Sequence, residues 1–157
     1  MKKNYLLFYL FVVISLYGCV YVDGKTPSNL QYLGQNFDQI YMDDYKLFWR
    51  ILHDAASRAR TCLDVSQTTE FIGLAKTMRG NAEFNEFLSE EIEMLAIDQT
   101  ECFLSAWHNA DEPTQAGVLR KLKSPLFIEP TALFKAFRPF AHGKYGEMVR
   151  YYLEAVP

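Results

Sequence analysis

The stretch of sequence that decides the fold is DDYKLFWRILHDAASRARTCL, residues 43–63. Its apolar side chains recur at every third or fourth position, which is the spacing of one face of an α-helix. On the opposite face Asp54 precedes Arg58 by one helical turn, the favourable order for an acid and a base, and Asp43 is suited to cap the start. The stretch therefore predicts a long amphipathic helix, with an inner face of Tyr45, Phe48, Trp49, Leu52, Ala55, Ala56, Ala59, Cys62 and Leu63.

The same periodicity continues on both sides of this stretch. Upstream it predicts one shorter helix with Gly34 inside it and with an inner face of Leu30, Leu33, Phe37 and Ile40. Along the whole chain, residues that favour the start of a helix precede each apolar stripe. These starts are Ser28 with Gln31, Ser66 or Thr68, Asn81, Asp98 with Glu101, Asp111 before Pro113, and Glu129 before Pro130.

The predicted fold class is all-α, because helical spacing recurs along the chain and, apart from Asp23-Gly24 in the linker, no Asn-Gly or Asp-Gly hairpin signal stands between apolar runs. Short segments with short connections favour antiparallel neighbours. Two arrangements fit: a compact multi-helix domain of short antiparallel amphipathic helices, and a short solenoid of helical hairpins. The 157 residues, of which 50% are hydrophobic and 22% charged, suffice for one globular domain. A net charge of −3 offers no basic surface for nucleic acid.

The first residues of the chain have the pattern of an export signal. Two lysines precede an apolar run over residues 5–17, which only Ser15 interrupts. The run leads into Leu16-Tyr17-Gly18-Cys19, which resembles the lipobox of bacterial lipoproteins. In that family the cysteine thiol receives a diacylglyceryl group, the signal is cleaved before the cysteine, and the new amine is usually acylated. The resemblance implies that residues 1–18 are a signal peptide and that Cys19 is the lipidated residue.

The resemblance also implies a location. Val20 stands where lipoproteins of the inner membrane of enteric-type bacteria often carry Asp, so a host with two membranes would hold this protein in the outer one, facing the periplasm. Residues 19–157 carry 14 basic and 19 acidic side chains, a net charge of −5, so acyl chains rather than a basic patch would anchor them. An uncleaved membrane helix over residues 5–22, which carry no charge, is the alternative, and it also places the body outside the cytoplasm.

This division predicts three parts of the chain. After the signal peptide, residues 19–29 form a lipidated N-terminus and a linker rich in turn-forming residues. Residues 30–157 then form the helical domain. With Cys19 assigned to lipid, Cys62 and Cys102 remain, and an even remainder in an exported protein indicates one disulfide between two helices. Two buried thiols are the alternative, because cysteine packs well in protein cores.

Residue patterns for catalysis are few. The sequence has no H-E-x-x-H, no G-x-S-x-G, no phosphate loop and no zinc-type cysteine spacing. We therefore expect no metal site and no cofactor, and lean against an enzyme. The charged and titratable clusters are interpreted as ordinary surface. They are His53, His108 and His142 as surface or capping residues, Glu83, Glu86, Glu90 and Glu93 on a solvated helix face with Glu91 at its border, and Arg120, Lys121 and Lys123 at a helix end.

Aromatic residues, 15% of the chain, are the unusual quantity. Tyrosine-rich surfaces are common at protein interfaces. The candidates for an exposed patch, with core positions as the alternative, are Tyr32, Tyr41, Tyr145, Tyr151 and Tyr152. The expected function is that of a lipid-anchored protein that binds another protein, as an accessory subunit of an envelope or secretion machine. A toxin-neutralising immunity lipoprotein is the alternative, and a small cell-envelope hydrolase a weaker one; the oligomeric state stays open.

Overall fold

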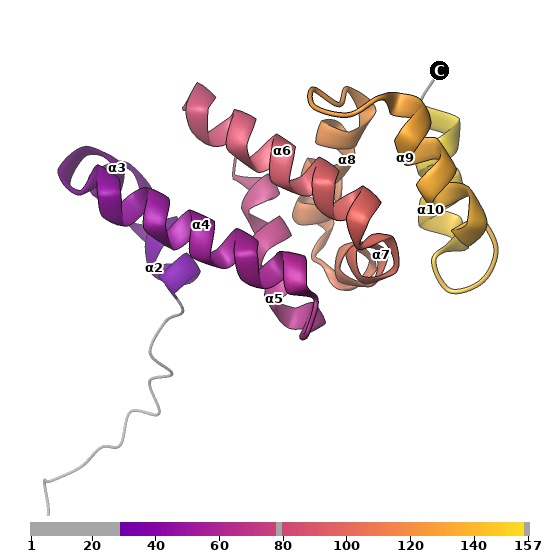
Figure 1. Cartoon of the computed structure of the whole chain (residues 1–157), viewed down its shortest axis with the longest axis horizontal. Coiled ribbons are helices and arrows are strands. Elements are labelled where there is room, and N and C mark those ends of the chain that lie inside the picture. The colour runs from indigo at the N-terminus through magenta and orange to yellow at the C-terminus, as the bar shows by residue number, and fades with distance from the viewer. Residues whose placement is uncertain (1–28, 78–79, 156–157) are drawn as a thin grey trace, which may run out of the picture.

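The computed structural model describes residues 29–77 and 80–155. Within these ranges the chain is helical and contains no strand, which confirms the all-α prediction. The N-terminal helices lie at one end of the longest axis and the C-terminal helices at the other (Figure 1). The elements are α2 (Asn29–Gln35), α3 (Phe37–Asp43), α4 (Tyr45–Thr61), α5 (Val65–Ile72), η1 (Gly73–Lys76), α6 (Ala82–Asp98), α7 (Thr100–Asn109), α8 (Glu112–Lys123), α9 (Pro130–Phe137), η2 (Arg138–Phe140) and α10 (Gly146–Ala155).

The helix starts agree with the sequence in part. Asn81 caps α6 by accepting a hydrogen bond from the Phe84 amide, and Asp111 caps α8 in the same way, as predicted. Asp44, not Asp43, caps α4, because Asp43 is the last residue of the preceding helix α3.

Asp64 caps α5 in place of Ser66 or Thr68. The reason is that Thr68 lies inside α5, fully buried, where its hydroxyl donates to the Ala59 carbonyl 3.2 Å away. The predicted restart near residue 98 is confirmed, although Gln99 rather than Asp98 stands at the N-cap of α7.

The upstream helix is interrupted, contrary to the prediction. It divides at Asn36 into α2 and α3, and the Asn36 side chain donates to the Tyr32 carbonyl 2.9 Å away, at the C-terminal end of α2. All four predicted inner residues of this segment are nevertheless buried. The predicted helix start at Ser28 lies outside the described residues.

One hydrophobic core runs from Leu30 on α2 to Tyr152 on α10. Within it, α8 and η1 approach each other closely, and a Cβ atom at Gly117 would collide with the carbonyl of Ala75. Only glycine therefore allows this contact without a shift of the backbone. Two residues predicted to face inward do not: Tyr45 is 47% exposed and Leu63 is 90% exposed. Leu63 follows the end of α4, where helical spacing no longer determines direction.

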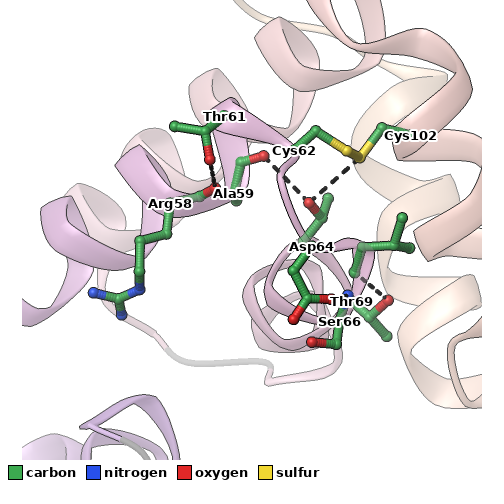
Figure 2. Close-up of a disulfide and its surroundings, with 10 residues drawn as sticks. Arg58, Ala59, Thr61, Cys62, Asp64, Ser66, Thr69 and Cys102 are labelled. Carbon is green, nitrogen blue, oxygen red and sulfur yellow. Dashed lines mark hydrogen bonds between the residues drawn. A yellow bond between two sulfur atoms is a disulfide. The ribbon is translucent and has the colours of Figure 1, made fainter.

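Cys62 and Cys102 are paired as a disulfide with Cα atoms 6.4 Å apart (Figure 2). The pair connects the end of α4 to the first turns of α7, the two helices expected from the sequence. Cys62 adopts φ 47°, the left-handed conformation in which helices often end. This conformation costs a residue with a side chain about 1 kcal/mol, and glycine would avoid that cost but could not form the bridge.

No helix within the described ranges is both long and apolar enough to span a membrane. The predicted signal peptide, Cys19 and most of the predicted linker lie outside these ranges, so these predictions stay untested.

Candidate functional site

The candidate site is a surface groove between α4 and α6. Side chains four residues apart line up on one helix face, so Tyr45, Trp49 and His53 form the α4 wall. Phe127, from the loop before α9, closes one side. The groove has a volume of about 430 Å³. We call it the acidic aromatic groove, and it is lined by Tyr45, Trp49, His53, Glu83, Glu86, Phe87, Glu90 and Phe127.

The rings of the groove hold one another in place. Trp49 meets Phe87 nearly at right angles, with ring centroids 5.4 Å apart, and His53 meets Phe87 at 4.9 Å. Trp49 also contacts Phe48, which is fully buried. Edge-to-face contacts of this kind add about 0.5–1.5 kcal/mol to the burial of each pair. The groove wall is thus a continuous extension of the core.

Glu83 organises the tyrosines at one end of the groove. The hydroxyls of Tyr45 and Tyr41 donate to its two carboxylate oxygens, at 2.6 and 3.1 Å. The hydrogen bond to Glu83 favours the neutral phenol and so raises the pKa of Tyr45 above its ordinary value, a shift that desolvation increases. The nearby Trp49 N–H group lowers the pKa of Tyr45, by less than Glu83 raises it. The Trp49 Nε1 atom is buried and makes no hydrogen bond within the described chain.

The loop that carries Phe127 is held by a buried carboxylate. Glu93 on α6 is 0% exposed and accepts backbone N–H groups from Leu126, Phe127 and Ile128 at 2.9, 2.8 and 3.2 Å. Three charge-assisted hydrogen bonds fix the loop backbone more firmly than neutral ones would. Leu126 and Phe127 remain 67% and 47% exposed. The structure thus uses a buried charge to present two large apolar side chains to solvent.

This position of Glu93 contradicts the prediction of a solvated face. Glu83, Glu86 and Glu90 are exposed, as predicted, but the C-terminal half of α6 is covered by α9 and by the loop that precedes it. The sequence contained one signal that was missed: Glu91 and Glu93 alternate with Ile92, Met94 and Leu95 in a largely apolar stretch.

Glu91, placed at the border by the sequence, is also buried. It pairs with Arg60 on α4, whose guanidinium approaches both carboxylate oxygens at 2.7 and 2.8 Å. Burial raises the pKa of Glu91, and the Arg60 charge partly offsets that rise. The Oε2 atom of Glu91 accepts no hydrogen bond of good geometry, and its charge is balanced by the Arg60 Nε atom 2.7 Å away.

The basic cluster at the end of α8 needs a correction as well. Arg120 and Lys123 are exposed, but Lys121 reaches across to α6, where its ammonium group donates to the Ser89 hydroxyl at 3.1 Å. Desolvation lowers the pKa of Lys121, and the nearby Glu93 charge opposes that shift. Lys121 therefore joins α8 to α6 instead of only complementing the end of its own helix.

The structure does not gather the other candidates into one site. His53 lines the groove, whereas His108 lies near Tyr145, with centroids 5.9 Å apart, and His142 lies beside η2. Of the five candidate tyrosines, Tyr32 and Tyr151 are exposed, Tyr41 and Tyr145 half-buried, and Tyr152 is fully buried. Among the described residues, no three His, Cys, Asp or Glu side chains are grouped to hold a metal ion.

A second hollow lies between α7, α8 and α10. It is larger, about 750 Å³, and is lined in part by Trp107, His108 and Tyr151. Its charged residues are of both signs, with three glutamates beside Lys144 and Arg150. Mixed charge selects for no particular ligand charge, so the acidic aromatic groove is the stronger candidate.

Comparison with models of known protein families, with curated proteins and with solved structures finds no match for this chain. Its function has to be argued from the groove and from the N-terminal sequence. The groove combines rings fixed by the core, three carboxylates, and an apolar rim on a loop fixed by Glu93.

Proposed function

We propose that this chain is a lipid-anchored protein of the cell envelope that faces the periplasm and binds another protein, as an accessory subunit of an envelope or secretion machine. The observation that carries the proposal is the acidic aromatic groove. Binding surfaces between proteins are enriched in aromatic side chains, and rings already fixed by their neighbours lose little entropy on binding. Tyr45 and Phe127 on its edge are both 47% exposed.

The N-terminal sequence supports the membrane part of the proposal. The motif Leu16-Tyr17-Gly18-Cys19 resembles a lipobox, and the described fold begins at Asn29. A segment of the length of residues 19–28 reaches at most about 35 Å when extended. Such a tether would keep the helical body near the membrane and leave the groove accessible to a neighbouring protein.

The anchor is tested by replacing Cys19 with serine. In cells fed radiolabelled or alkyne-tagged palmitate, the unmodified protein should incorporate label and lose residues 1–18, as intact-mass spectrometry will show. Cys19→Ser should remove both the label and the cleavage, because the glyceryl group that carries the acyl chains is attached to the cysteine sulfur through a thioether. A serine variant that is still cleaved and labelled would contradict the lipid anchor.

The partner is tested by photo-crosslinking in intact cells. A benzoyl-phenylalanine at position 45 or 127 should give an adduct of defined mass, since both side chains border the groove. The matched control is the same probe at Tyr151, which is 59% exposed on α10 at the second hollow. No protein adduct at positions 45 and 127, or the same adducts at all three positions, would contradict binding through the groove.

A further inference from the structure

The charge of the groove limits what it can bind. Glu83, Glu86 and Glu90 line it, and no lysine or arginine does. Within the described chain, none of the three forms an ion pair, since the ion pairs there are Arg60–Glu91 and Lys76–Asp111. An anionic ligand would be repelled, whereas a cation would meet three carboxylates.

The rings determine which kind of cation fits. A cation within about 6 Å of an aromatic face is attracted by the ring quadrupole, and the long apolar stems of lysine and arginine pack against rings. Trp49 and Phe87 line the groove in contact with each other, and each is half-buried. A metal ion has no apolar stem to pack against these rings. A purely apolar group would leave three carboxylates partly desolvated without a partner.

The surroundings of the groove favour a side chain of a polypeptide over a free small amine. Phe127 lines the groove and is 47% exposed, and the preceding residue Leu126 is 67% exposed on the same loop outside the groove lining. A polypeptide that continues from the groove over this loop would find apolar contacts beside the bound cation. The volume of about 430 Å³ accommodates one or two side chains. The loop at the rim is fixed by Glu93 before any partner arrives, which reduces the entropy lost on binding.

We propose that the acidic aromatic groove binds an arginine or lysine side chain of a partner polypeptide, with the stem of that side chain against Trp49 and Phe87 and its charge among the three glutamates. This inference rests on the proposed protein-binding function and adds the chemistry of the partner: a basic residue flanked by apolar ones. Charge complementarity of this kind also predicts binding that weakens with salt.

The test uses the full-length chain, purified in dodecyl maltoside, immobilised, and used to select from a library of random linear peptides. The selected peptides should carry arginine or lysine next to an apolar residue. Replacing that arginine by citrulline, which keeps the shape and removes the charge, should weaken binding about tenfold or more. Raising NaCl from about 50 to about 500 mM should weaken binding in the same direction.

Two triple variants identify the site. Glu83→Gln, Glu86→Gln and Glu90→Gln together should cause a similar loss of affinity for the selected peptides. The matched control is Glu112→Gln, Glu147→Gln and Glu154→Gln, three exposed carboxylates at the second hollow, which should leave affinity unchanged. Circular dichroism of both variants checks that they fold, and the amides keep the shape and the acceptor oxygen of the side chains they replace.

Several results would overturn the inference. Selected peptides without a basic residue, or peptides that bind the groove variant as tightly as the unmodified chain, would refute the basic side chain and leave protein binding intact. If no peptide is selected but groove adducts form in cells, the basic side chain alone is refuted. If no peptide is selected and no groove adducts form, protein binding through the groove is refuted as well. A dimer in ultracentrifugation that the groove variant loses would assign the groove to a second copy of the chain.

Discussion

Two aromatic clusters of similar composition have opposite relations to solvent. The sealed aromatic cluster lies among α7, α9 and α10, and all its rings are buried: Phe103, Trp107, Phe137 and Tyr152. The open aromatic cluster begins in the core and reaches the surface at the groove; it consists of Phe37, Phe48, Phe84, Tyr41, Tyr45, Trp49 and Phe87. Both are built from helices with ordinary amphipathic spacing.

The polar atoms of the two clusters show what this difference means. In the sealed aromatic cluster, the Trp107 Nε1 donates to the Gln115 carbonyl and the Tyr152 hydroxyl to the Leu122 carbonyl, both on α8. In the open aromatic cluster, the tyrosine hydroxyls donate to the surface carboxylate Glu83. Polar groups satisfied by backbone belong to a closed core, whereas those satisfied by an exposed charge belong to a surface that can exchange partners.

The largest expected loss of stability comes from replacing the tryptophan of the sealed cluster, Trp107, and it should exceed the loss from replacing Trp49 of the open cluster. Trp107→Ala should lower the free energy of unfolding by about 3–5 kcal/mol, because it leaves a cavity in a closed core and removes a buried hydrogen bond. Trp49→Ala should cost less, about 1–2 kcal/mol, since part of its ring already contacts solvent. Urea unfolding followed by circular dichroism measures both. Equal losses would remove the distinction between a sealed and an open cluster.

The disulfide connects the helices of the two clusters and gives the next effect. Replacing Cys62 and Cys102 together by serine should lower the free energy of unfolding by about 2–4 kcal/mol, because the bridge closes a loop of 40 positions in the unfolded chain. Dithiothreitol should destabilise the unmodified protein by the same amount and leave the double variant unchanged. Rapid labelling of both thiols by maleimide in the denatured, unreduced protein would show instead that the bridge is absent.

The local parts of this fold could be predicted from the sequence. The all-α class, the caps Asn81 and Asp111, and the pairing partner of Cys62 follow from spacing and from the chemistry of a few neighbouring residues. These features depend on contacts within a turn of helix or on the number of cysteines. Helical spacing also placed Phe48 correctly in the core.

The groove could not be predicted in the same way. Helical spacing assigns Tyr45 and Trp49 to an inner face, but it does not say how far along that face the neighbouring helices extend. Phe127 reaches the groove only because Glu93, 34 positions earlier, holds its loop. A contact between such distant residues depends on the packing of α6 against the loop, which no local pattern in one sequence reports.

Substitution of the two buried glutamates, Glu93 and Glu91, should change the free energy of unfolding by less, and by different amounts. Glu93→Gln should lower the free energy of unfolding by about 1–3 kcal/mol, because an amide accepts through one oxygen and turns its NH₂ group toward backbone donors. Hydrogen exchange of the Leu126 and Phe127 amides should become faster, and peptide binding at the groove weaker. Unchanged exchange at these amides would contradict the role of Glu93 in holding the loop.

Glu91→Gln is the matched control for that variant. Burial raises the pKa of Glu91, so the folded state favours its protonated form, and the charged form at neutral pH costs stability. Its partner Arg60 is half exposed and can turn to water. The neutral amide should therefore change the free energy of unfolding by no more than about 0.5 kcal/mol. Protonated Glu91 therefore favours the folded state at low pH, and this contribution to the free energy of unfolding is lost as the pH rises through the raised pKa of Glu91.

The smallest effect concerns the hydroxyl of Tyr45 at the edge of the open cluster. Hydrogen bonding to Glu83 raises the pKa of Tyr45 above 10.0, with smaller effects from desolvation and from the neighbouring Tyr41. A raised pKa means that the folded state favours the neutral phenol, so its contribution to stability is complete below pH 10 and is lost as the pH rises through the raised value. Tyr45→Phe removes this contribution at every pH.

The stability difference between the unmodified protein and Tyr45→Phe should therefore be constant from pH 7 to 9 and shrink above pH 10, as measured by urea unfolding across that range. Tyr151→Phe, which removes a hydroxyl from an exposed ring on α10, is the matched control. The alkaline titration of Tyr152, whose pKa burial raises to about 12, is common to both variants and cancels in the comparison. A Tyr45→Phe difference that persists unchanged above pH 10 would show that Glu83 does not hold this hydroxyl, and the acidic end of the groove would then lack its fixed tyrosine.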